Sequence, residues 1–528
     1  MRPTGPIPPF AAFVLAALMS VGLWAWLGRP VALPDVPGGR LQCLSYAPSH
    51  DGVAPQDKTF APPLGLIEAD MARLKPITNC VRTYSSLGSE GDVVTAAAAQ
   101  GMKVLVGIWI GADDKINAQE IERGLALSAA YPEAVKAIVV GNEVLLRREM
   151  TGEKLAGVIR SVKARTRHPV TYADIYEFWR RNPVVGDAVD WVTVHVLPYW
   201  DDPTPVGIDA VQAHVKGIVE AARAIFPAKP VEVGEVGWPS AGRTRGGAVP
   251  SRVNEARFLR EFALQADALG VAYNVIEAID QPWKRAPEGT VGGYWGVLDK
   301  DRKPKFPLTG PVSEWPLWPW AAGFTVAGAV LALGAALARR RTLQPAGWMA
   351  TAATGAATAG LLWAFADQAL DFAIGVHGAL WGAYLWLLAA AGGALLARHW
   401  AGRPPLSETP LAAFRWLVLV PAAAVALSVA VDGRHRDFLT LAFLLPAAAL
   451  FFCDRAPRKK NAAEAWLGAT VLISGPLGID WFTNYEAILW AGCCLLLAYP
   501  FLGQMAAELG RLLAVLGEQD DGGYHRHG

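Results

Sequence analysis

Two different patterns of hydrophobic and polar residues divide the chain near residue 315. Before this point, short apolar runs alternate with longer segments in which apolar and charged residues are mixed. After it, long apolar runs follow one another with few charges between them. The first pattern predicts buried strands that alternate with helices, and the second predicts helices that span a membrane.

The alternating pattern predicts eight strands, most of them followed by a helix. The expected strands lie at residues 41–46, 79–84, 103–109, 137–140, 170–174, 190–196, 231–235 and 272–278. The expected helices lie at residues 63–74, 92–100, 118–130, 154–165, 209–225 and 255–269. Eight strand–helix steps in about 270 residues are typical of a (β/α)8 TIM barrel in both number and size.

The later apolar runs predict seven membrane helices, at residues 316–338, 346–366, 372–397, 412–431, 437–453, 464–479 and 486–503. An earlier run at residues 10–27 fits either a cleaved signal peptide or an uncleaved anchor. Because Gly28, Arg29 and Pro30 follow it without a small-residue cleavage site, we expect an anchor. The predicted fold class is an α/β protein, a (β/α)8 TIM barrel followed by an α-helical multi-pass membrane domain.

The chain is therefore expected to have five parts. They are an N-terminal membrane anchor at residues 1–29, a Pro/Gly-rich linker at 30–40, the barrel domain at 41–312, a seven-helix membrane domain at 316–503 and a cytoplasmic tail at 504–528.

Basic residues in alternate loops predict the orientation of the helical part. The basic loops contain Arg339 to Arg341; Arg398 and Arg403; and Arg455, Arg458, Lys459 and Lys460. The intervening loops at residues 367–371, 432–437 and 480–486 are mostly acidic. Since basic loops face the cytoplasm, the C-terminus is expected inside and the segment before residue 316 outside. Arg2, ahead of the first helix, places the barrel on the same outer side.

The overall charge and the cysteines narrow the function classes. The net charge is +1 and no basic stripe with interleaved aromatic residues is present, so nucleic-acid binding is not expected. Cys43 and Cys80, near two predicted strands, could form a disulfide or remain free buried thiols, and both alternatives stay open. No spacing of cysteine and histidine suggests a metal site, so neither a metal nor a cofactor is expected.

Two glutamates stand at the ends of predicted strands. In A-I-V-V-G-N-E-V, Glu143 follows an apolar run; in V-E-V-G-E-V-G-W-P-S, Glu235 stands where glycine, tryptophan and proline turn the chain out of its strand. The C-terminal ends of barrel strands share one face, so these two carboxyl groups are expected to meet there. Cleavage of a glycosidic bond commonly uses two facing carboxyl groups.

Taken together, the ordered motifs resemble glycoside hydrolase family 17, whose members act on β-1,3-glucans. V-G-N-E-V and V-G-E-V-G-W-P-S look like the two catalytic motifs of that family, and C-V-R-T-Y at residues 80–84 resembles its second-strand motif. Y-N-V-I-E-A-I-D-Q-P-W-K, followed by Y-W-G-V-L, resembles its last strand and closing loop. The resemblance implies a retaining mechanism with Glu143 as the general acid/base and Glu235 as the nucleophile. We expect Glu143 to be protonated at rest, because of an apolar site and the nearby charge of Glu235.

Further residues are expected to bind the substrate beside this pair. Asn142 is expected to hydrogen-bond the 2-hydroxyl of the sugar. Arg82 could orient Glu235, hold a sugar hydroxyl or form an ordinary barrel salt bridge. Aromatic side chains at strand ends suit stacking on sugar rings, with core packing as the alternative. The expected substrate-binding residues are Asn142, Arg82, Tyr84, Tyr46, His195, Tyr199, Trp238, Glu277, Trp283 and Lys284.

Some positions depart from the plant members of the family. Gln281 and Gly292 stand where plant members carry acidic residues, and His195 stands where they carry an asparagine. These changes leave the catalytic pair in place and indicate an altered acceptor side. Asp174 and Glu177 also lie near a strand end, where we expect solvated loop charges.

The membrane helices favour transfer over hydrolysis. A glycosyl-enzyme can pass its sugar to water or to a sugar hydroxyl, and tethering beside a nascent glucan raises the effective concentration of acceptor chains. We therefore expect a membrane-bound retaining β-glucan transglycosylase that elongates, branches through β-1,6 bonds or cyclises an exported β-1,3-glucan. The alternatives are a membrane-tethered endo-β-1,3-glucanase and an inactive glucan-binding or export subunit.

The expected partners and location follow from this interpretation. The partners are a β-glucan, membrane lipids and, as a hypothesis, a glucan-synthesising glycosyltransferase. The expected location is a bacterial inner membrane, with the catalytic domain in the periplasm and the C-terminus in the cytoplasm.

Overall fold

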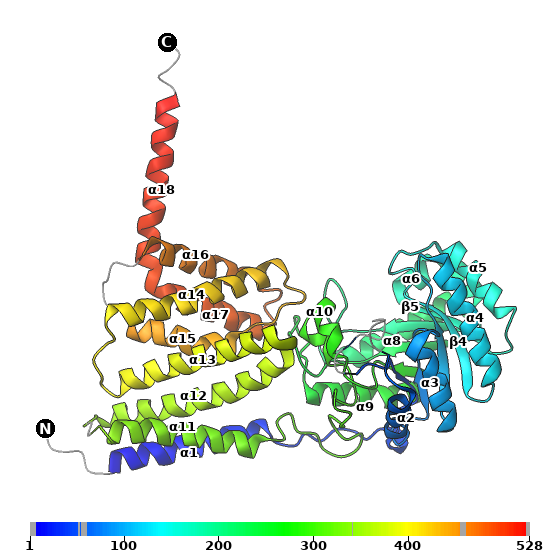
Figure 1. Cartoon of the computed structure of the whole chain (residues 1–528), viewed down its shortest axis with the longest axis horizontal. Helices are drawn as coiled ribbons and strands as arrows, with labels where there is room; N and C mark the ends of the chain where they lie inside the picture. The colour runs from blue at the N-terminus through cyan, green and yellow to red at the C-terminus, as the bar shows by residue number, and fades with distance from the viewer. Residues whose placement is uncertain (1–6, 51–52, 54–60, 340–341, 455–460, 524–528) are drawn as a thin grey trace. The chain divides into compact units, whose positions relative to one another are not determined.

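The computed structural model describes residues 7–50, 53, 61–339, 342–454 and 461–523. The chain divides into two compact units, which are described separately (Figure 1). The helical unit comprises Met1–Arg29, Arg243–Arg245 and Glu314–Gly528, and the barrel unit comprises Pro30–Gly242 and Gly246–Ser313.

Eight parallel strands close the barrel unit into a barrel, with each strand paired to its neighbours in chain order. They are β1 (Leu44–Ser45), β2 (Cys80–Arg82), β3 (Lys103–Ile108), β4 (Val135–Asn142), β5 (Val170–Ile175), β6 (Val192–Val196), β7 (Val231–Val236) and β8 (Tyr273–Val275). The predicted fold class is confirmed, and each expected strand is present.

Helices surround this barrel (Figure 1). The predicted ones are α2 (Leu64–Leu74), α3 (Gly88–Ala99), α4 (Asp114–Ala130), α5 (Gly152–Lys163), α8 (Val211–Ile225) and α9 (Arg252–Leu269). Two more, α6 (Tyr176–Arg181) and α7 (Pro183–Ala188), lie between β5 and β6 and are not evident in the sequence pattern. Each has only six residues, too few for a helical period of 3.6 residues to stand out.

The strands are apolar throughout because both of their faces are buried. On β4, Ala137 and Val139 belong to a cluster in the barrel interior, whereas Ile138 and Val140 belong to the larger core formed with the helices. This alternation follows from the two-residue period of a strand. It also sets the default direction of every side chain at a strand end.

Residues 30–40, expected as a Pro/Gly-rich linker, make contacts with the end of the barrel unit. Val31 forms an antiparallel bridge with Val312, and the N–H of Val36 donates to the carbonyl of Leu308 at 3.0 Å. The side chain of Val36 is buried. Apolar residues within a Pro/Gly-rich segment can thus pack on a neighbouring core, which composition alone does not reveal.

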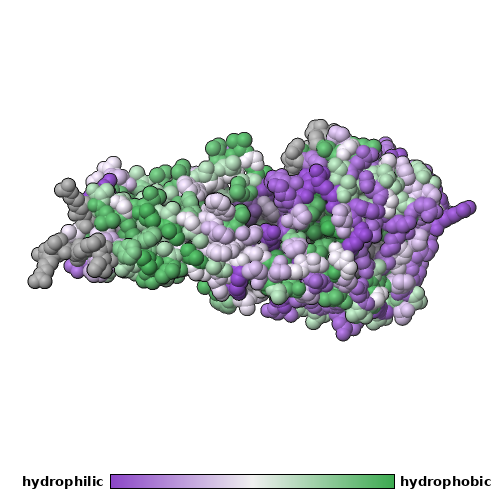
Figure 2. All heavy atoms as spheres, turned by 90° about the horizontal axis from the view of Figure 1, so that it is seen from below, coloured by the Kyte–Doolittle hydropathy of each residue, from purple (hydrophilic) through white to green (hydrophobic). Residues whose placement is uncertain are grey.

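Each predicted apolar run of the helical unit is a helix. The helices are α1 (Ile7–Leu27), α11 (Trp318–Leu337), α12 (Pro345–Phe372), α13 (Gly375–Trp400), α14 (Glu408–Val431), α15 (Thr440–Cys453), α16 (Ala462–Leu477), α17 (Tyr485–Ala498) and α18 (Leu502–Gly523). Among the described residues, six stretches are long and apolar enough to cross a membrane: Pro8–Leu27, Trp318–Leu337, Pro345–Phe372, Gly375–Trp400, Glu408–Val431 and Tyr485–Ala514. Figure 2 shows hydrophobic residues gathered over this unit and hydrophilic residues over the barrel.

Three features of the helical unit differ from the expectation. α15 and α16 have 14 and 16 residues, fewer than the roughly 20 that a membrane-spanning helix needs. The acidic stretch at 367–371 lies on the last turns of α12 rather than in a loop. The expected tail continues as α18. Several residues used to orient the helices lie outside the described residues, as does the end of the tail: Arg2, Arg340, Arg341, Arg455, Arg458, Lys459, Lys460 and residues 524–528.

Cys43 and Cys80 form a disulfide, with Cα atoms 4.4 Å apart and a sequence separation of 37. It cross-links the chain just before β1 to the start of β2. Replacing both cysteines by alanine is expected to lower the free energy of unfolding of the barrel unit by about 3–4 kcal/mol, because a closed loop of this length restricts the unfolded chain.

The measurement is the urea midpoint of the barrel unit in the full-length protein, followed by hydrogen exchange of peptides from β2 and α3. The matched control is Cys453→Ala, which removes a free thiol of the helical unit. Equal midpoints for the double variant and the control would contradict the stabilising role.

Candidate active site

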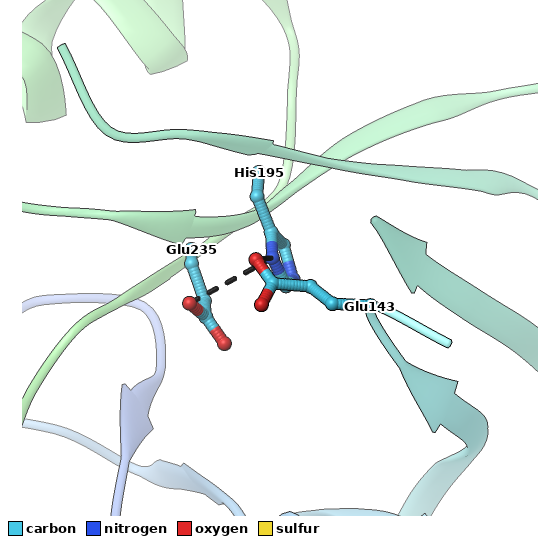
Figure 3. Close-up of side chains that lie close together, drawn as sticks. All are labelled: Glu143, His195 and Glu235. Carbon is cyan, nitrogen blue, oxygen red and sulfur yellow. Dashed lines mark hydrogen bonds and ion pairs between the residues drawn. The ribbon is translucent and has the colours of Figure 1, made fainter. Parts of the chain in front are cut away.

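Glu143 and Glu235 meet at the C-terminal ends of β4 and β7. One carboxylate oxygen of each lies, together with a ring nitrogen of His195, within 4.8 Å of the others. Figure 3 shows the two carboxyl groups pointing toward one another from opposite sides, with the ring of His195 beside them. The side chain of Glu235 is buried, whereas that of Glu143 is 23% exposed.

The backbone at the end of β4 is irregular, which redirects Asn142 and Glu143. The pairing with β5 shifts register between Val139 and Asn142, and Gly141 has a φ of 87°. A Cβ at Gly141 would also lie 2.7 Å from a neighbouring side chain, so this position requires glycine. Glu143 has a φ of 54°, a conformation uncommon for glutamate and typical of residues held at active sites.

A β-bulge redirects Glu235 in a similar way. Val194 and His195 of β6 are consecutive, but they pair with Val233 and Glu235 of β7, so β7 carries one extra residue, Gly234. Strict alternation would point Glu235 outward, like the buried Val233 that faces the helices. The bulge instead turns the carboxyl group of Glu235 into the barrel mouth, beside His195.

Arg82, at the end of β2, contacts residues of both β4 and β7. Its Nη1 donates to the carbonyl of Gly234 at 2.8 Å and to Oε1 of Glu235 at 3.2 Å, and its Nη2 donates to Oδ1 of Asn142 at 2.5 Å. Both partners of the Arg82–Glu235 ion pair are buried. Among the three roles considered for Arg82, these contacts favour orientation of Glu235.

His195 lies close to the carboxyl groups of both Glu143 and Glu235. Its Nδ1 lies 3.1 Å from Oε1 of Glu143 and 3.7 Å from Oε2 of Glu235. Two carboxylates and an imidazole are donor types that divalent metal ions bind. Arg82, however, already places a positive charge against Glu235 and lies 3.5 Å from Nε2 of His195. This charge opposes a second cation, so we assign no metal site to the group.

The ionisation of Glu143 differs from the expectation. Burial acts to raise the pKa of Glu143, but the hydrogen bond and charge of His195 outweigh it, together with the charges of Arg147 and Arg82, and hold the pKa below its usual value. The apolar site that was expected to keep Glu143 protonated therefore contains three favourable partners for the carboxylate. Glu143 should carry its proton only in acidic solution.

Tyr84 lies half-buried beside Arg82, whose guanidinium carbon is 4.9 Å from the centre of the tyrosine ring. Its hydroxyl donates to Oγ of Ser45 at 3.0 Å. Burial and the charge of Glu235 raise the pKa of Tyr84 well above its usual value, so the hydroxyl stays neutral. Glu90 fixes the following loop, because its Oε2 accepts the backbone N–H of Tyr84 at 2.7 Å and of Ser85 at 2.9 Å.

Glu277, Trp283 and Lys284 lie together after β8. Nζ of Lys284 is 2.9 and 2.8 Å from the two carboxylate oxygens of Glu277. Burial raises the pKa of Glu277 to about 7, although Lys284 opposes the shift. Trp283 is half-buried and donates from Nε1 to Oε1 of Gln281 at 2.8 Å. Burial acts to lower the pKa of Lys284, but the charges of Glu277, Glu288 and Glu235 raise it above its usual value.

Three predicted substrate-binding aromatics are instead part of the core. Tyr46, Tyr199 and Trp238 are 1%, 0% and 0% exposed. The hydroxyl of Tyr46 donates to Asp70 at 2.9 Å, and Nε1 of Trp238 donates to the carbonyl of Val249 at 3.0 Å. The rings of Tyr199 and Trp238 pack edge to face. The three rings pack against other protein side chains, and the buried rings have no face available for a sugar. The structure therefore contradicts a sugar-stacking role for all three.

Two further charged residues belong to the surroundings of the site. Asp174, expected as a solvated loop charge, is fully buried, accepts from the hydroxyl of Tyr172 and has its pKa raised to about 6, mainly by burial. Arg147 donates to the carbonyl of Asn142 and lies over the ring of Trp109, 4.1 Å from its centre. Asp174 lies within β5, one residue before its end, and Arg147 lies five residues after β4, so a place near a strand end is the sequence signal that they share with Glu143.

Known proteins share the barrel region. Residues 43–296 match the BtgE/BtgC glycoside hydrolase domain. A glucan 1,3-beta-glucosidase of Arthroderma benhamiae is 31% identical over 260 residues, which cover 45% of this chain and 82% of that protein. The chain belongs to this glycoside hydrolase family. The resemblance recognised in the sequence is therefore confirmed.

Other relatives of this glycoside hydrolase match over a similar region. A glucan 1,3-beta-glucosidase of Saccharomyces cerevisiae is 27% identical over 270 residues, covering 46% of this chain and 84% of that protein. Among solved structures, the glycoside hydrolase family 17 β-1,3-glucanosyltransferase of Rhizomucor miehei is similar at 26% identity. That match covers 50% of this chain and 95% of the other, with a TM-score of 0.44.

Arg82→Lys tests the orienting role of the guanidinium. Lysine keeps the positive charge but cannot bridge Glu235 and Asn142 with two planar nitrogen atoms. We expect kcat for glycosidic-bond cleavage to fall by roughly 10²-fold, the effect of a small misplacement of a reacting group. Arg73→Lys, where an exposed arginine pairs with the buried Asp70, is the matched control and should leave kcat unchanged. Equal values of kcat for the two variants would contradict the orienting role of Arg82.

Glu90 predicts a pH dependence of stability. Burial raises its pKa to about 7, although two backbone N–H groups oppose the shift. An unfolded glutamate has a pKa of about 4.3, so the folded chain binds this proton more tightly. The resulting stability is complete below about pH 4 and is lost as the pH rises toward 7.

The variant Glu90→Gln removes this titration. Between about pH 5 and pH 8, the unfolding midpoint of the β2–α3 region should fall less in the variant than in the wild type. The control is Glu68→Gln, at an exposed position of α2. The idea fails if all three proteins lose stability with the same slope.

Proposed function

We propose that the barrel is a retaining β-glucan transglycosylase, which cuts a β-1,3-glucan and joins one fragment to another glucan chain. The main support is that carboxylate oxygens of Glu143 and Glu235 lie within 4.8 Å of each other. Retaining enzymes hold their carboxyl groups about 5–5.5 Å apart, whereas inverting enzymes need about 6.5–9.5 Å. The names of the relatives, glucan 1,3-beta-glucosidases, support the choice of substrate.

In the first half of the reaction, Glu235 attacks the anomeric carbon while Glu143 gives its proton to the leaving oxygen. The glycosidic bond breaks and an ester forms between the sugar and Glu235. In the second half, Glu143 takes the proton of an incoming hydroxyl, whose oxygen attacks the same carbon and releases Glu235. Because Oδ1 of Asn142 accepts from Arg82, Asn142 presents its amide nitrogen as a donor to the 2-hydroxyl.

The helical unit supports transfer as the physiological outcome. A barrel attached to apolar helices stays close to the membrane from which a nascent glucan emerges, and this raises the local concentration of acceptor hydroxyls. On this interpretation the protein lies in a bacterial inner membrane with its barrel in the periplasm, beside a glucan-synthesising glycosyltransferase. Its products are elongated, β-1,6-branched or cyclic glucans.

The test uses the full-length protein in detergent micelles with a β-1,3-linked gluco-oligosaccharide of defined length. Products are followed by mass spectrometry and linkage analysis. Products both longer and shorter than the substrate support the transglycosylase, and new β-1,6 bonds identify branching. Only shorter products would establish a tethered glucanase, and binding without turnover would establish a glucan-binding subunit.

The two glutamates are expected to respond differently to the leaving group. Glu235→Gln should lose ~10³-fold or more in rate with every substrate, because no ester can form. Glu143→Gln should lose a similar factor with the oligosaccharide but retain ester formation from a nitrophenyl β-glucoside, whose leaving group needs no proton.

A burst of nitrophenol from Glu143→Gln, and none from Glu235→Gln, is the diagnostic measurement. The control is Glu177→Gln, because Glu177 pairs with Arg180 and Arg181 outside the site. Identical behaviour of Glu143→Gln and Glu235→Gln with the activated substrate would contradict the assigned roles.

A further inference from the structure

Nδ1 of His195 lies 3.1 Å from Oε1 of Glu143 and 3.7 Å from Oε2 of Glu235 in the barrel mouth. His195 lies on β6, in register with Glu235 of β7, and its side chain is 0% exposed. The sequence resemblance places an asparagine at this position in plant relatives. This chain therefore has a titratable ring where an amide is expected, in direct contact with the proposed acid/base.

Arg82 orients the donor of this ring. Its Nη1 lies 3.5 Å from Nε2 of His195, and an arginine side chain can only donate hydrogen bonds. Nε2 therefore suits Arg82 as an acceptor, and Nδ1 is the ring nitrogen that donates. Nδ1 lies 3.1 Å from Oε1 of Glu143.

In the proposed reaction, Glu143 is the group that gains and loses a proton. Since Oε1 of Glu143 already accepts from Nδ1, the added proton is placed on Oε2, the other oxygen.

We propose that His195 is a positioning residue that occupies Oε1 of Glu143 and thereby makes Oε2 the oxygen that gives and takes the proton in glycosyl transfer. No bond forms or breaks at the ring: its proton stays on Nδ1 throughout. The proton from Oε2 passes to the leaving oxygen in the first half, and the proton of the acceptor hydroxyl returns to Oε2 in the second. This inference rests on the proposed function, because it assigns a partner to the acid/base of that reaction.

The proposal has a consequence for pH dependence. The charged and titratable groups facing Glu143 are His195 on β6, Glu235 on β7, Arg82 on β2, Asp174 on β5 and Arg147 after β4. Replacing His195 alone removes the donor to Oε1 and leaves the others in place. Burial then dominates and favours protonated Glu143, so the high-pH limb of kcat/KM, which reports the acid of the free enzyme, should move to higher pH.

The experiment compares His195→Leu and His195→Asn with the wild-type full-length protein in detergent. His195→Leu should lose ~10²-fold in kcat with the oligosaccharide, which needs the proton, and remain within about 2-fold in ester formation from a nitrophenyl β-glucoside, which does not. Its high-pH limb should shift upward. His195→Asn restores an amide donor and should recover most of the oligosaccharide rate.

The control is Thr193→Ser, a buried change on the same strand, which should alter neither the limb nor the leaving-group dependence. The proposal is overturned if His195→Leu slows both substrates equally with an unmoved limb, or if an active His195→Asn shows no recovery relative to His195→Leu. An inactive wild-type protein would instead overturn the proposed function, so the two failures are distinguishable.

Discussion

The geometry of the site depends on one buried cation. Arg82 reaches from β2 to an oxygen of Glu235, to the carbonyl beneath it on β7 and to Asn142 on β4. A buried carboxylate without a partner is strongly unfavourable, and Arg82 supplies both the opposite charge and fixed donors. Because the guanidinium is planar, the same contact that neutralises Glu235 also fixes its position relative to Asn142.

The two strands that contact Arg82, β4 and β7, are irregular near their C-terminal ends, and a regular β7 would direct Glu235 away from the barrel mouth. Gly141 on β4 and Gly234 on β7 each allow a local shift in register, and the glutamate that follows closely then faces the barrel mouth. A strained φ at Glu143 accompanies the first shift. The rest of the barrel, with apolar residues on both faces of its strands, supplies the rigidity that holds these irregularities in place.

The sequence predicts the strands and the position of the two glutamates, which depend on local periodicity and spacing. It does not predict the direction in which side chains at strand ends point. The strands and the two glutamates follow from apolar runs that end in turn residues. Tyr199 and Trp238 have the same local sequence pattern as a sugar-binding aromatic residue, yet both side chains are buried. Whether a side chain at a strand end points into the barrel mouth or into the core depends on β-bulges, which the residue pattern does not predict. The burial of Asp174 and the packing of residues 30–40 likewise depend on neighbours that are distant in sequence.

In the proposed glycosyl transfer, the two halves place opposite demands on Glu143. As an acid it benefits from burial, which favours the protonated form, and as a base it benefits from His195, Arg147 and Arg82, which favour the carboxylate. In this chain the second influence prevails. A lowered pKa keeps Glu143 ionised, which is the form that the second half requires, whereas the first half requires the protonated form. Under the proposed function, this ionised Glu143 activates whichever hydroxyl reaches the ester, so the local concentration of acceptor chains decides between transfer and hydrolysis.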